Sequence, residues 1–301
     1  MSRSNNKTSL IGITGGKGGT GKTMVATNLA TSFMQNGKKT LIIDCDVDAP
    51  NVAILLGSRL EKSEDVKVFQ PIFDHEKCTR CGKCSDVCRE HAILQVKSQF
   101  PILFAELCTG CESCLLICPD DAISAGEKVI GWIHEGSAYG IDLVVGELKL
   151  HEVRGAAVVK AAKKRAFRKN LVGKYDIIII DTAPGAHCDV VNALFGMDIT
   201  FAVTEPTSFG AHDLDLILSL LELMKLKTFV VLNRSDMKGS QDLIGEVSKK
   251  HSTEIVSEIP LDRSILDCYV RGVPVVLASP FAPGAKALLS LYEKAKELLE
   301  I

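Results

Sequence analysis

Residues 15–23 constrain the fold of this chain more than any other stretch. They read Gly-Gly-Lys-Gly-Gly-Thr-Gly-Lys-Thr and fill the pattern G-x-x-x-x-G-K-[ST] from Gly16 to Thr23. An apolar run at residues 10–13 precedes them, and a helical pattern follows. A glycine loop between a strand and a helix binds phosphate, because its backbone N–H groups turn toward an anion and the helix presents its positive dipole end. We therefore expect a nucleotide site here.

The pattern also assigns roles within the loop. Lys22 is expected to reach the β- and γ-phosphates, and Thr23 to hold Mg²⁺. The rest of the loop would cradle the phosphates with its backbone, at Gly16, Gly18, Gly19, Thr20 and Gly21.

Beyond the loop, strand-like and helix-like segments alternate. Short apolar and β-branched runs predict strands at residues 40–43, 129–133, 141–145, 175–180, 199–203, 228–232 and 254–259. Helical patterns occur at residues 23–35, 155–171, 213–224, 241–250, 264–270 and 283–299. This order predicts an α/β fold of the P-loop NTPase kind, with a mostly parallel sheet and helices on both faces.

Carboxylates follow two of the predicted strands. Asp44 and Asp46 end the strand at residues 40–43, and Asp181 ends the run at residues 175–180. Open α/β sheets place their chemistry at the carboxyl ends of the strands, so we favour functional roles for all three. Asp48 and Asn51 have a second interpretation, as caps of the next helix.

Eight of the 11 cysteines lie between residues 78 and 118, and they form an internal repeat. Each half has the spacing C-x₂-C-x₂-C-x₃-C, typical of bacterial ferredoxins, in which the fourth cysteine crosses to the other cluster. We predict one 4Fe–4S cluster on Cys78, Cys81, Cys84 and Cys118, and a second on Cys108, Cys111, Cys114 and Cys88. Zinc is the alternative, but a zinc site closes with four ligands and needs no third cysteine at the same step.

The two halves differ after the fourth cysteine. Pro119 follows Cys118 as the motif expects, whereas Arg89 follows Cys88. A cation there favours the reduced, more negative cluster, so we expect unequal reduction potentials.

The cysteine block also sets the expected domain organisation. Periodicity is lost at residues 61–71, which we interpret as a junction. We expect a ferredoxin-type domain at residues 69–126, inserted into an ATPase domain made of residues 1–68 and 127–301.

Composition excludes several classes of protein. The net charge is −2, which argues against a general nucleic-acid binder, and the basic helix at residues 155–171 has a single aromatic residue, Phe167, for base stacking. No run of about 18 apolar residues occurs, and residues 1–9 lack the apolar core of a signal peptide. We expect a cytoplasmic protein without a membrane span.

Lys17 makes the loop more specific, because it lies five positions before Lys22 and completes a deviant Walker A signature. With it, the chain resembles the MinD/ParA/Mrp-type ATPases, a group that includes the nitrogenase iron protein. The resemblance covers about residues 8–60 and 140–300. It implies an ATP-dependent dimer, either a homodimer or a heterodimer with a paralogue, in which Lys17 reaches the partner's phosphates.

The same resemblance implies further roles at the site. Asp46 would orient the attacking water, with Asp44 as the carboxylate before it. Asp181 would be the Walker B aspartate near Mg²⁺, and Gly185 the glycine of switch II. The resemblance implies an adenine contact at three further residues, namely Asn233, Pro260 and Asp262.

Three cysteines remain outside the repeat. We interpret Cys45 and Cys268 as packing residues. Cys188 lies seven residues after Asp181, where the nitrogenase iron protein has a cysteine that helps to hold a cluster between subunits. Two Cys188 thiolates in a homodimer would supply half of the usual four ligands, and this bridging cluster stays an open alternative.

Together these features predict a Mg²⁺-dependent ATPase that carries two 4Fe–4S clusters and couples ATP to electron transfer toward a redox partner. Two alternatives remain. One is ATP-dependent assembly or delivery of iron–sulfur or other metal clusters to a partner protein. The other is a cell-division or cargo-positioning ATPase whose clusters sense redox state.

Overall fold

The structure is a computed structural model that describes residues 8–170, 173–239 and 241–301. The chain forms two compact units. We call residues 8–64, 133–147 and the described part of 155–301 the sheet unit, and residues 65–132 and 148–154 the cysteine unit. Two long strands, β3 (Leu60–Phe73) and β6 (Ile123–Ala138), each pass from one unit into the other.

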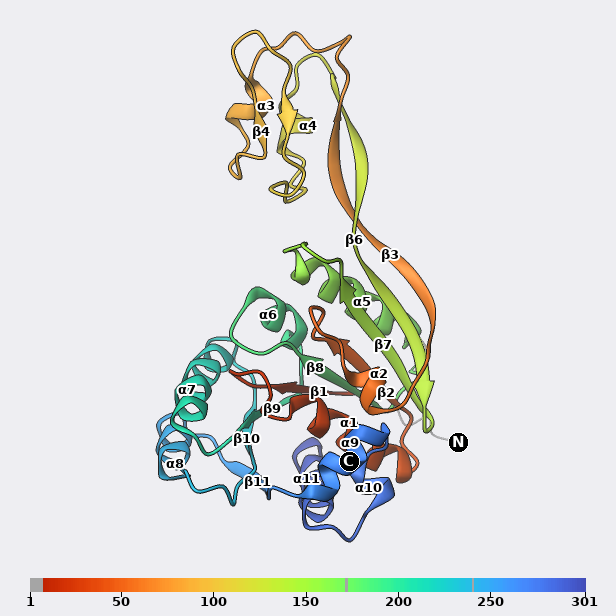
Figure 1. The fold of residues 1–301 in the computed structure, drawn as a ribbon, viewed down its shortest axis with the longest axis vertical. Coiled ribbons are helices and arrows are strands. Elements are labelled where there is room, and N and C mark those ends of the chain that lie inside the picture. Colours follow the sequence, from red (N-terminus) through yellow and green to blue (C-terminus); the bar gives the residue numbers. More distant parts are fainter. Residues whose placement is uncertain (1–7, 171–172, 240) are drawn as a thin grey trace. The chain divides into compact units, whose positions relative to one another are not determined.

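The sheet has the strand order β11-β10-β9-β1-β8-β2-β7-β6-β3 (Figure 1). Its parallel strands are β1 (Ser9–Thr14), β2 (Thr40–Cys45), β7 (Ile141–Leu148), β8 (Ile177–Thr182), β9 (Ile199–Thr204), β10 (Thr228–Asn233) and β11 (Ile255–Ile259). Only Tyr139 and Gly140 join β6 to β7, which makes those two strands antiparallel neighbours. The predicted mostly parallel α/β fold is confirmed.

Every residue of β2, β8 and β9 is buried, as expected for strands covered on both faces. Side chains alternate along β1: Ile11 and Ile13 join the core that contains α1 (Lys22–Gln35) and α11 (Pro283–Leu299). Gly12 faces the opposite side, where a Cβ would lie 2.4 Å from Leu194 of α6 (Cys188–Leu194). Helices therefore cover both faces of the sheet (Figure 1).

The other helices of the sheet unit are α2 (Val52–Leu55), α5 (Gly155–Lys169), α7 (Ser208–Leu223), α8 (Gln241–Lys250), α9 (Arg263–Arg271) and α10 (Val275–Ala278). Helix α7 begins earlier than residue 213, where the sequence predicted it, because the Thr207 hydroxyl accepts a hydrogen bond from the Gly210 N–H and caps it. The predicted end of α5 at Leu171 lies outside the described residues.

The boundary between the two units, between residues 64 and 65, lies within the predicted junction at residues 61–71, but this stretch is also part of a continuous strand, β3, which the sequence did not predict. Of its residues 65–71, only Val66 and Pro71 are buried. Charged side chains pair across the ribbon instead, as between Lys67 and Glu127 at 2.8 Å. A strand with so little apolar surface lacks the alternation by which strands are recognised.

The cysteine unit repeats its backbone as it repeats its sequence. It contains α3 (Lys83–Asp86), β4 (Ile93–Leu94), β5 (Ile102–Leu103) and α4 (Ser113–Ile117), with β4 and β5 antiparallel. Residues 30 positions apart share the left-handed conformation: φ is 61° at Arg80 and 77° at Gly110, and 50° at His91 and 49° at Asp121. Arg80, His91 and Asp121 adopt it without being glycine, which marks a constrained backbone.

Within the described residues, no helix is both long enough and apolar enough to cross a membrane.

Candidate functional site

The glycine loop adopts a conformation that other residues could not easily share. Gly19 and Gly21 have φ values of 80° and 101°, and α1 starts directly afterwards at Lys22. A Cβ at Gly21 would lie 2.4 Å from Nδ2 of Asn233, and one at Gly16 would lie 2.2 Å from the backbone of Asp213. The glycines are thus needed for both backbone conformation and close packing.

Lys22 is the first residue of α1, and its side chain reaches back to the glycine loop. Its side chain is buried, and Nζ donates a hydrogen bond to the Lys17 carbonyl at 3.2 Å. Burial lowers the pKa of Lys22, although the nearby carboxylates of Asp181 and Asp46 oppose this shift. The loop thus holds a buried cation against one of its own backbone carbonyls.

Asp44 and Asp181 pair in register on β2 and β8, and both are fully buried. The Asp44 carboxylate accepts hydrogen bonds from the N–H groups of Asp46 (3.1 Å), Asn51 (2.9 Å) and Val52 (2.9 Å). It therefore anchors the start of α2, the role that the capping interpretation gave to Asp48 or Asn51. At α2, Asn51 makes no side-chain cap bond.

Asp181 has a different environment. Neither carboxylate oxygen accepts a hydrogen bond of good geometry from a described residue. Burial raises the pKa of Asp181 to about 7, against the opposing effects of the Thr23 hydroxyl and the Lys22 charge. A buried carboxylate that accepts no hydrogen bond of good geometry, beside a phosphate loop and its threonine, fits the needs of Mg²⁺.

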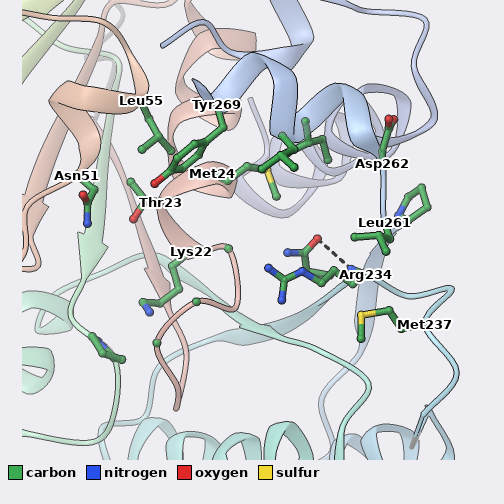
Figure 2. Close-up of a pocket in the computed structure, with 18 of the residues that line it drawn as sticks. Lys22, Thr23, Met24, Asn51, Leu55, Arg234, Met237, Leu261, Asp262 and Tyr269 are labelled. Atoms are coloured by element: carbon green, nitrogen blue, oxygen red, sulfur yellow. Dashed lines mark hydrogen bonds between the residues drawn. The ribbon is translucent and has the colours of Figure 1, made fainter. Parts of the chain in front are cut away.

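A cavity of about 670 Å³ opens over the loop (Figure 2). Of the predicted site residues, it is lined by Gly18, Gly19, Gly21, Lys22, Thr23, Asp46, Asn233, Pro260 and Asp262. The remaining predicted residues lie outside its lining, namely Gly16, Lys17, Thr20, Asp44, Asp181 and Gly185. The loop and the proposed base contacts therefore share one cavity.

Most of the apolar residues that line the cavity were not predicted from the sequence, namely Met24, Leu55, Met237, Leu261, Ile265, Leu266 and Tyr269. Ile265, Leu266 and Tyr269 are neighbours on α9, but such spacing is equally typical of helices that pack into a core. No motif marked them. Figure 2 shows labelled members of this set around the loop that carries Lys22.

The predicted adenine contacts are also used within the fold. Asn233 Nδ2 donates to the Thr20 carbonyl at 2.8 Å, which ties the end of β10 to the glycine loop. Asp262 accepts hydrogen bonds from the N–H groups of Ser264 and Gly284, each at 2.8 Å, and caps α9.

Lys17 lies outside the cavity lining. Its Nζ forms an ion pair with Glu205 Oε1 at 3.0 Å, and Arg234 Nη1 lies 2.7 Å from Glu205 Oε2. Neither Glu205 nor Arg234 was singled out in the sequence.

The segment that follows β8 contacts the glycine loop through its backbone. Gly185, with φ of 91°, donates its N–H to the Gly15 carbonyl at 3.0 Å. Cys188 is the first residue of α6 and is exposed, whereas Cys45 and Cys268 are buried, as expected for packing residues.

In the cysteine unit, the eight repeat cysteines surround two hollows. Cys78, Cys81, Cys84 and Cys118 line the first, and Cys88, Cys108, Cys111 and Cys114 line the second. Among the described residues, no three Cys, His, Asp or Glu side chains converge closely enough to hold a single metal ion. A 4Fe–4S cluster spreads its four cysteines over four irons, and each of these two rings supplies four thiols.

The sulfur atoms have polar neighbours. The Ala122 N–H donates to Cys118 Sγ at 3.3 Å, and Cys111 Sγ lies 3.4 Å from the Ser113 hydroxyl. That hydroxyl lowers the pKa of Cys111, whereas burial raises the pKa of Cys114 to about 11. Hydrogen bonds to sulfur are one means by which proteins tune cluster potentials.

Comparisons with known proteins agree with the nucleotide site. An uncharacterised protein of Methanocaldococcus jannaschii is 36% identical over 269 residues, covering 87% of this chain and 90% of its own length. The iron-sulfur cluster carrier protein of Pyrococcus abyssi is 24% identical and covers 94% of this chain and 84% of its own length.

The fold is similar to that of the septum site-determining protein MinD from Pyrococcus horikoshii OT3, solved with Mg-ADP. The TM-score is 0.59 at 21% identity, with 97% of this chain and 98% of that chain covered. Residues 11–275 match the family model of the CobQ/CobB/MinD/ParA nucleotide binding domain. The chain therefore belongs to the CobQ/CobB/MinD/ParA family of nucleotide-binding domains.

Proposed function

We propose that this protein is an ATP-hydrolysing dimer switch that carries two 4Fe–4S clusters and couples ATP to electron transfer toward a partner redox protein. The observation that carries the proposal is the combination in one chain of a P-loop cavity with two rings of four cysteines. In domain terms, residues 69–126 would carry the clusters, and residues 1–68 and 127–301 would form the ATPase domain.

In the sheet unit, the phosphates of ATP would lie against the loop. Lys22 supplies positive charge at the β- and γ-phosphates, and Asp46 orients the attacking water. Thr23 and Asp181 would hold Mg²⁺, which when bound neutralises charge on the phosphate oxygens. Such transfer needs little covalent chemistry from the protein, so positioned charges suffice.

The apolar side of the same cavity suits the base. Asn233 and Pro260 lie on its rim, with Arg234, Met237 and Leu261 beside them. An adenine ring needs flat apolar contact and a few directed polar groups, which these residues combine. Asp262 lines the cavity but already accepts two backbone N–H groups, so we assign it mainly to the position of α9.

The dimer explains Lys17, which is not needed for a phosphate loop in one chain. In the dimer, Lys17 of each subunit would contact the phosphates of the other, so that ATP lies between two copies. Whether the partner is a second copy or a paralogue follows from which chains associate on addition of ATP.

In the cysteine unit, the two rings of thiolates would hold the clusters, which when bound supply one-electron transfer. The arrangement matches the crossed pattern of bacterial ferredoxins, with Cys118 and Cys88 exchanged between the halves.

An anaerobic experiment tests the coupling. The reduction potentials of both clusters are measured with and without ATP, and the ATPase rate with clusters oxidised and reduced. We expect ATP to shift the potentials in the native chain but not in Lys17→Ala, which keeps all eight cysteines. If neither quantity responds to the other in the native chain, coupling is excluded and the positioning role is favoured.

Cluster delivery is a second candidate, because relatives such as that of Pyrococcus abyssi are named iron-sulfur cluster carrier proteins. The eight cysteines already complete two ligand sets, so a delivered cluster would need other thiols, and Cys188 is the exposed one outside the rings. Transfer of iron to an apo-acceptor on addition of ATP, lost in Cys188→Ser, would favour this candidate.

A further inference from the structure

Glu205 lies between two cations at the edge of the nucleotide loop. Its carboxylate is 3.0 Å from Lys17 Nζ through Oε1 and 2.7 Å from Arg234 Nη1 through Oε2. The Glu205 side chain is only 8% exposed, whereas those of Lys17 and Arg234 are 42% and 39% exposed. A buried carboxylate thus has two counter-ions that both reach toward solvent.

The backbone fixes the position of Glu205. It follows the last residue of β9, and its carbonyl accepts the Thr207 N–H at 2.8 Å. Gly210 of α7 packs so closely that a Cβ would lie 2.3 Å from this carbonyl. The backbone that carries the carboxylate is therefore held in place beside α7.

Arg234 is fixed by a different part of the same site. It adopts a left-handed conformation, with φ of 53°, directly after β10. Its own N–H donates to Asn233 Oδ1 at 3.0 Å, and Asn233 in turn bonds to the Thr20 carbonyl. The two counter-ions of Glu205 thus come from the glycine loop and from the rim of the cavity.

These positions have an energetic consequence. Removing the only counter-ion of a buried carboxylate is strongly destabilising, because it leaves an uncompensated buried charge. If Lys17 moves away, Arg234 remains within hydrogen-bond distance of Glu205. Lys17 can therefore leave without creating an unpaired buried charge, and it is the more exposed of the two partners.

We propose that Glu205 is a positioning residue that holds Lys17 within its own subunit, and that Arg234 permits its release when the dimer forms. The inference rests on the proposed dimer, in which Lys17 must reach the other subunit. Glu205 and the phosphates of the opposite subunit then compete for one ammonium group. This competition sets how readily ATP drives dimerisation.

The two sides of Glu205 predict opposite effects. In Glu205→Gln the negative charge is lost, so Lys17 is no longer held. The dissociation constant of the dimer at saturating ATP should then fall about three- to tenfold. In Arg234→Gln, Glu205 keeps Lys17 as its remaining counter-ion, so the dimer should be weaker by a similar factor. If the two substitutions acted only by destabilising the fold, both would weaken the dimer.

The full chain is studied by sedimentation at saturating ATP, with nucleotide affinity of the monomer measured separately because Arg234 lines the cavity. Glu293→Gln is the matched control, because it removes a surface ion pair with Lys296 far from the loop in sequence. Its dimer constant should equal that of the native chain.

A second readout does not need the dimer. The rate at which an amine-acylating reagent modifies Lys17 in nucleotide-free protein is followed by mass spectrometry. It should rise in Glu205→Gln and fall in Arg234→Gln. Unchanged labelling in Glu205→Gln, or dimer constants that shift in the same direction in both variants, would overturn the proposal.

The two failures can be told apart. If the native chain does not dimerise with ATP, the proposed function fails, while the labelling rates still decide whether Glu205 restrains Lys17. If Glu205→Gln does not fold, Lys17 labelling in Arg234→Gln decides whether Glu205 restrains Lys17: a slower rate supports the proposal, and an unchanged or faster rate overturns it.

Discussion

Asp44 and Asp181 face each other in register across β2 and β8, yet only Asp44 is satisfied by hydrogen bonds. Both carboxyl groups are completely buried, and burial raises the pKa of each. The difference in partners separates a carboxyl group that holds the backbone before α2 from one whose oxygens could serve the proposed Mg²⁺ site.

The first prediction concerns the pH dependence of stability without ligand. The pKa of Asp181 is about 7 in the folded chain against an ordinary 3.8, so the native state holds a proton that the unfolded state releases. The free energy of unfolding should therefore fall as the pH rises from about 4 to 7, by roughly 2–4 kcal/mol. Denaturant unfolding at several pH values measures this slope.

Asp181→Asn provides the control, because it cannot lose a proton. The free energy of unfolding of this variant should depend less steeply on pH. Part of the dependence should remain, because burial also raises the pKa of Asp44. At pH 8, Mg²⁺ with ATP should stabilise the native chain and not the variant. Equal slopes in the two proteins would show that Asp181 ionises normally.

Asp44 gives the second prediction. Asp44→Ala removes the acceptor of three backbone N–H groups, so the free energy of unfolding should fall by about 2–4 kcal/mol. Asp46 lines the cavity, so Asp46→Asn should instead slow ATP hydrolysis with little loss of stability. Thermal unfolding and ATPase rates of both variants are compared. Equal destabilisation by both would contradict this division.

Much of this site could be predicted from local sequence. The glycine loop works through residues adjacent in the chain, so its pattern is visible without a fold. The strand ends at Asp44 and Asp181 follow from apolar runs that stop abruptly. These elements carry their own signal because the same residues both form and terminate them.

Other features depend on tertiary structure. Glu205 and Arg234 directly follow β9 and β10, and the parallel pairing of these strands brings them together. Tyr269 lines the cavity from a helix whose pattern resembles any amphipathic helix. Strand β3 was not predicted because its charged residues, such as Lys67, which pairs with Glu127 on the neighbouring strand, are also typical of a linker.

The third prediction concerns Lys17. Lys17→Ala should abolish ATP-dependent dimerisation and reduce ATP hydrolysis by at least tenfold, while nucleotide binding by the monomer stays within a few-fold, because Lys17 lies outside the cavity lining. Lys22→Ala is the comparison, and it should weaken nucleotide binding itself. Unchanged hydrolysis in Lys17→Ala would exclude a role for this residue across the dimer.

The last prediction tests how the cysteines are shared. The two proposed clusters would contribute about eight irons per chain, and Cys118→Ser should remove about four of them, with loss of one of two EPR signals. Cys188→Ser is the control and should retain all eight, unless a bridging cluster exists.

Double substitutions then reveal the crossing. Adding Cys78→Ser to Cys118→Ser should remove no further iron, because both residues line the same hollow. Adding Cys108→Ser should remove the rest, because Cys108 lines the other one. The reverse result would assign Cys118 to the cluster of its own half, and the ferredoxin pattern of crossed fourth ligands would not apply to this chain.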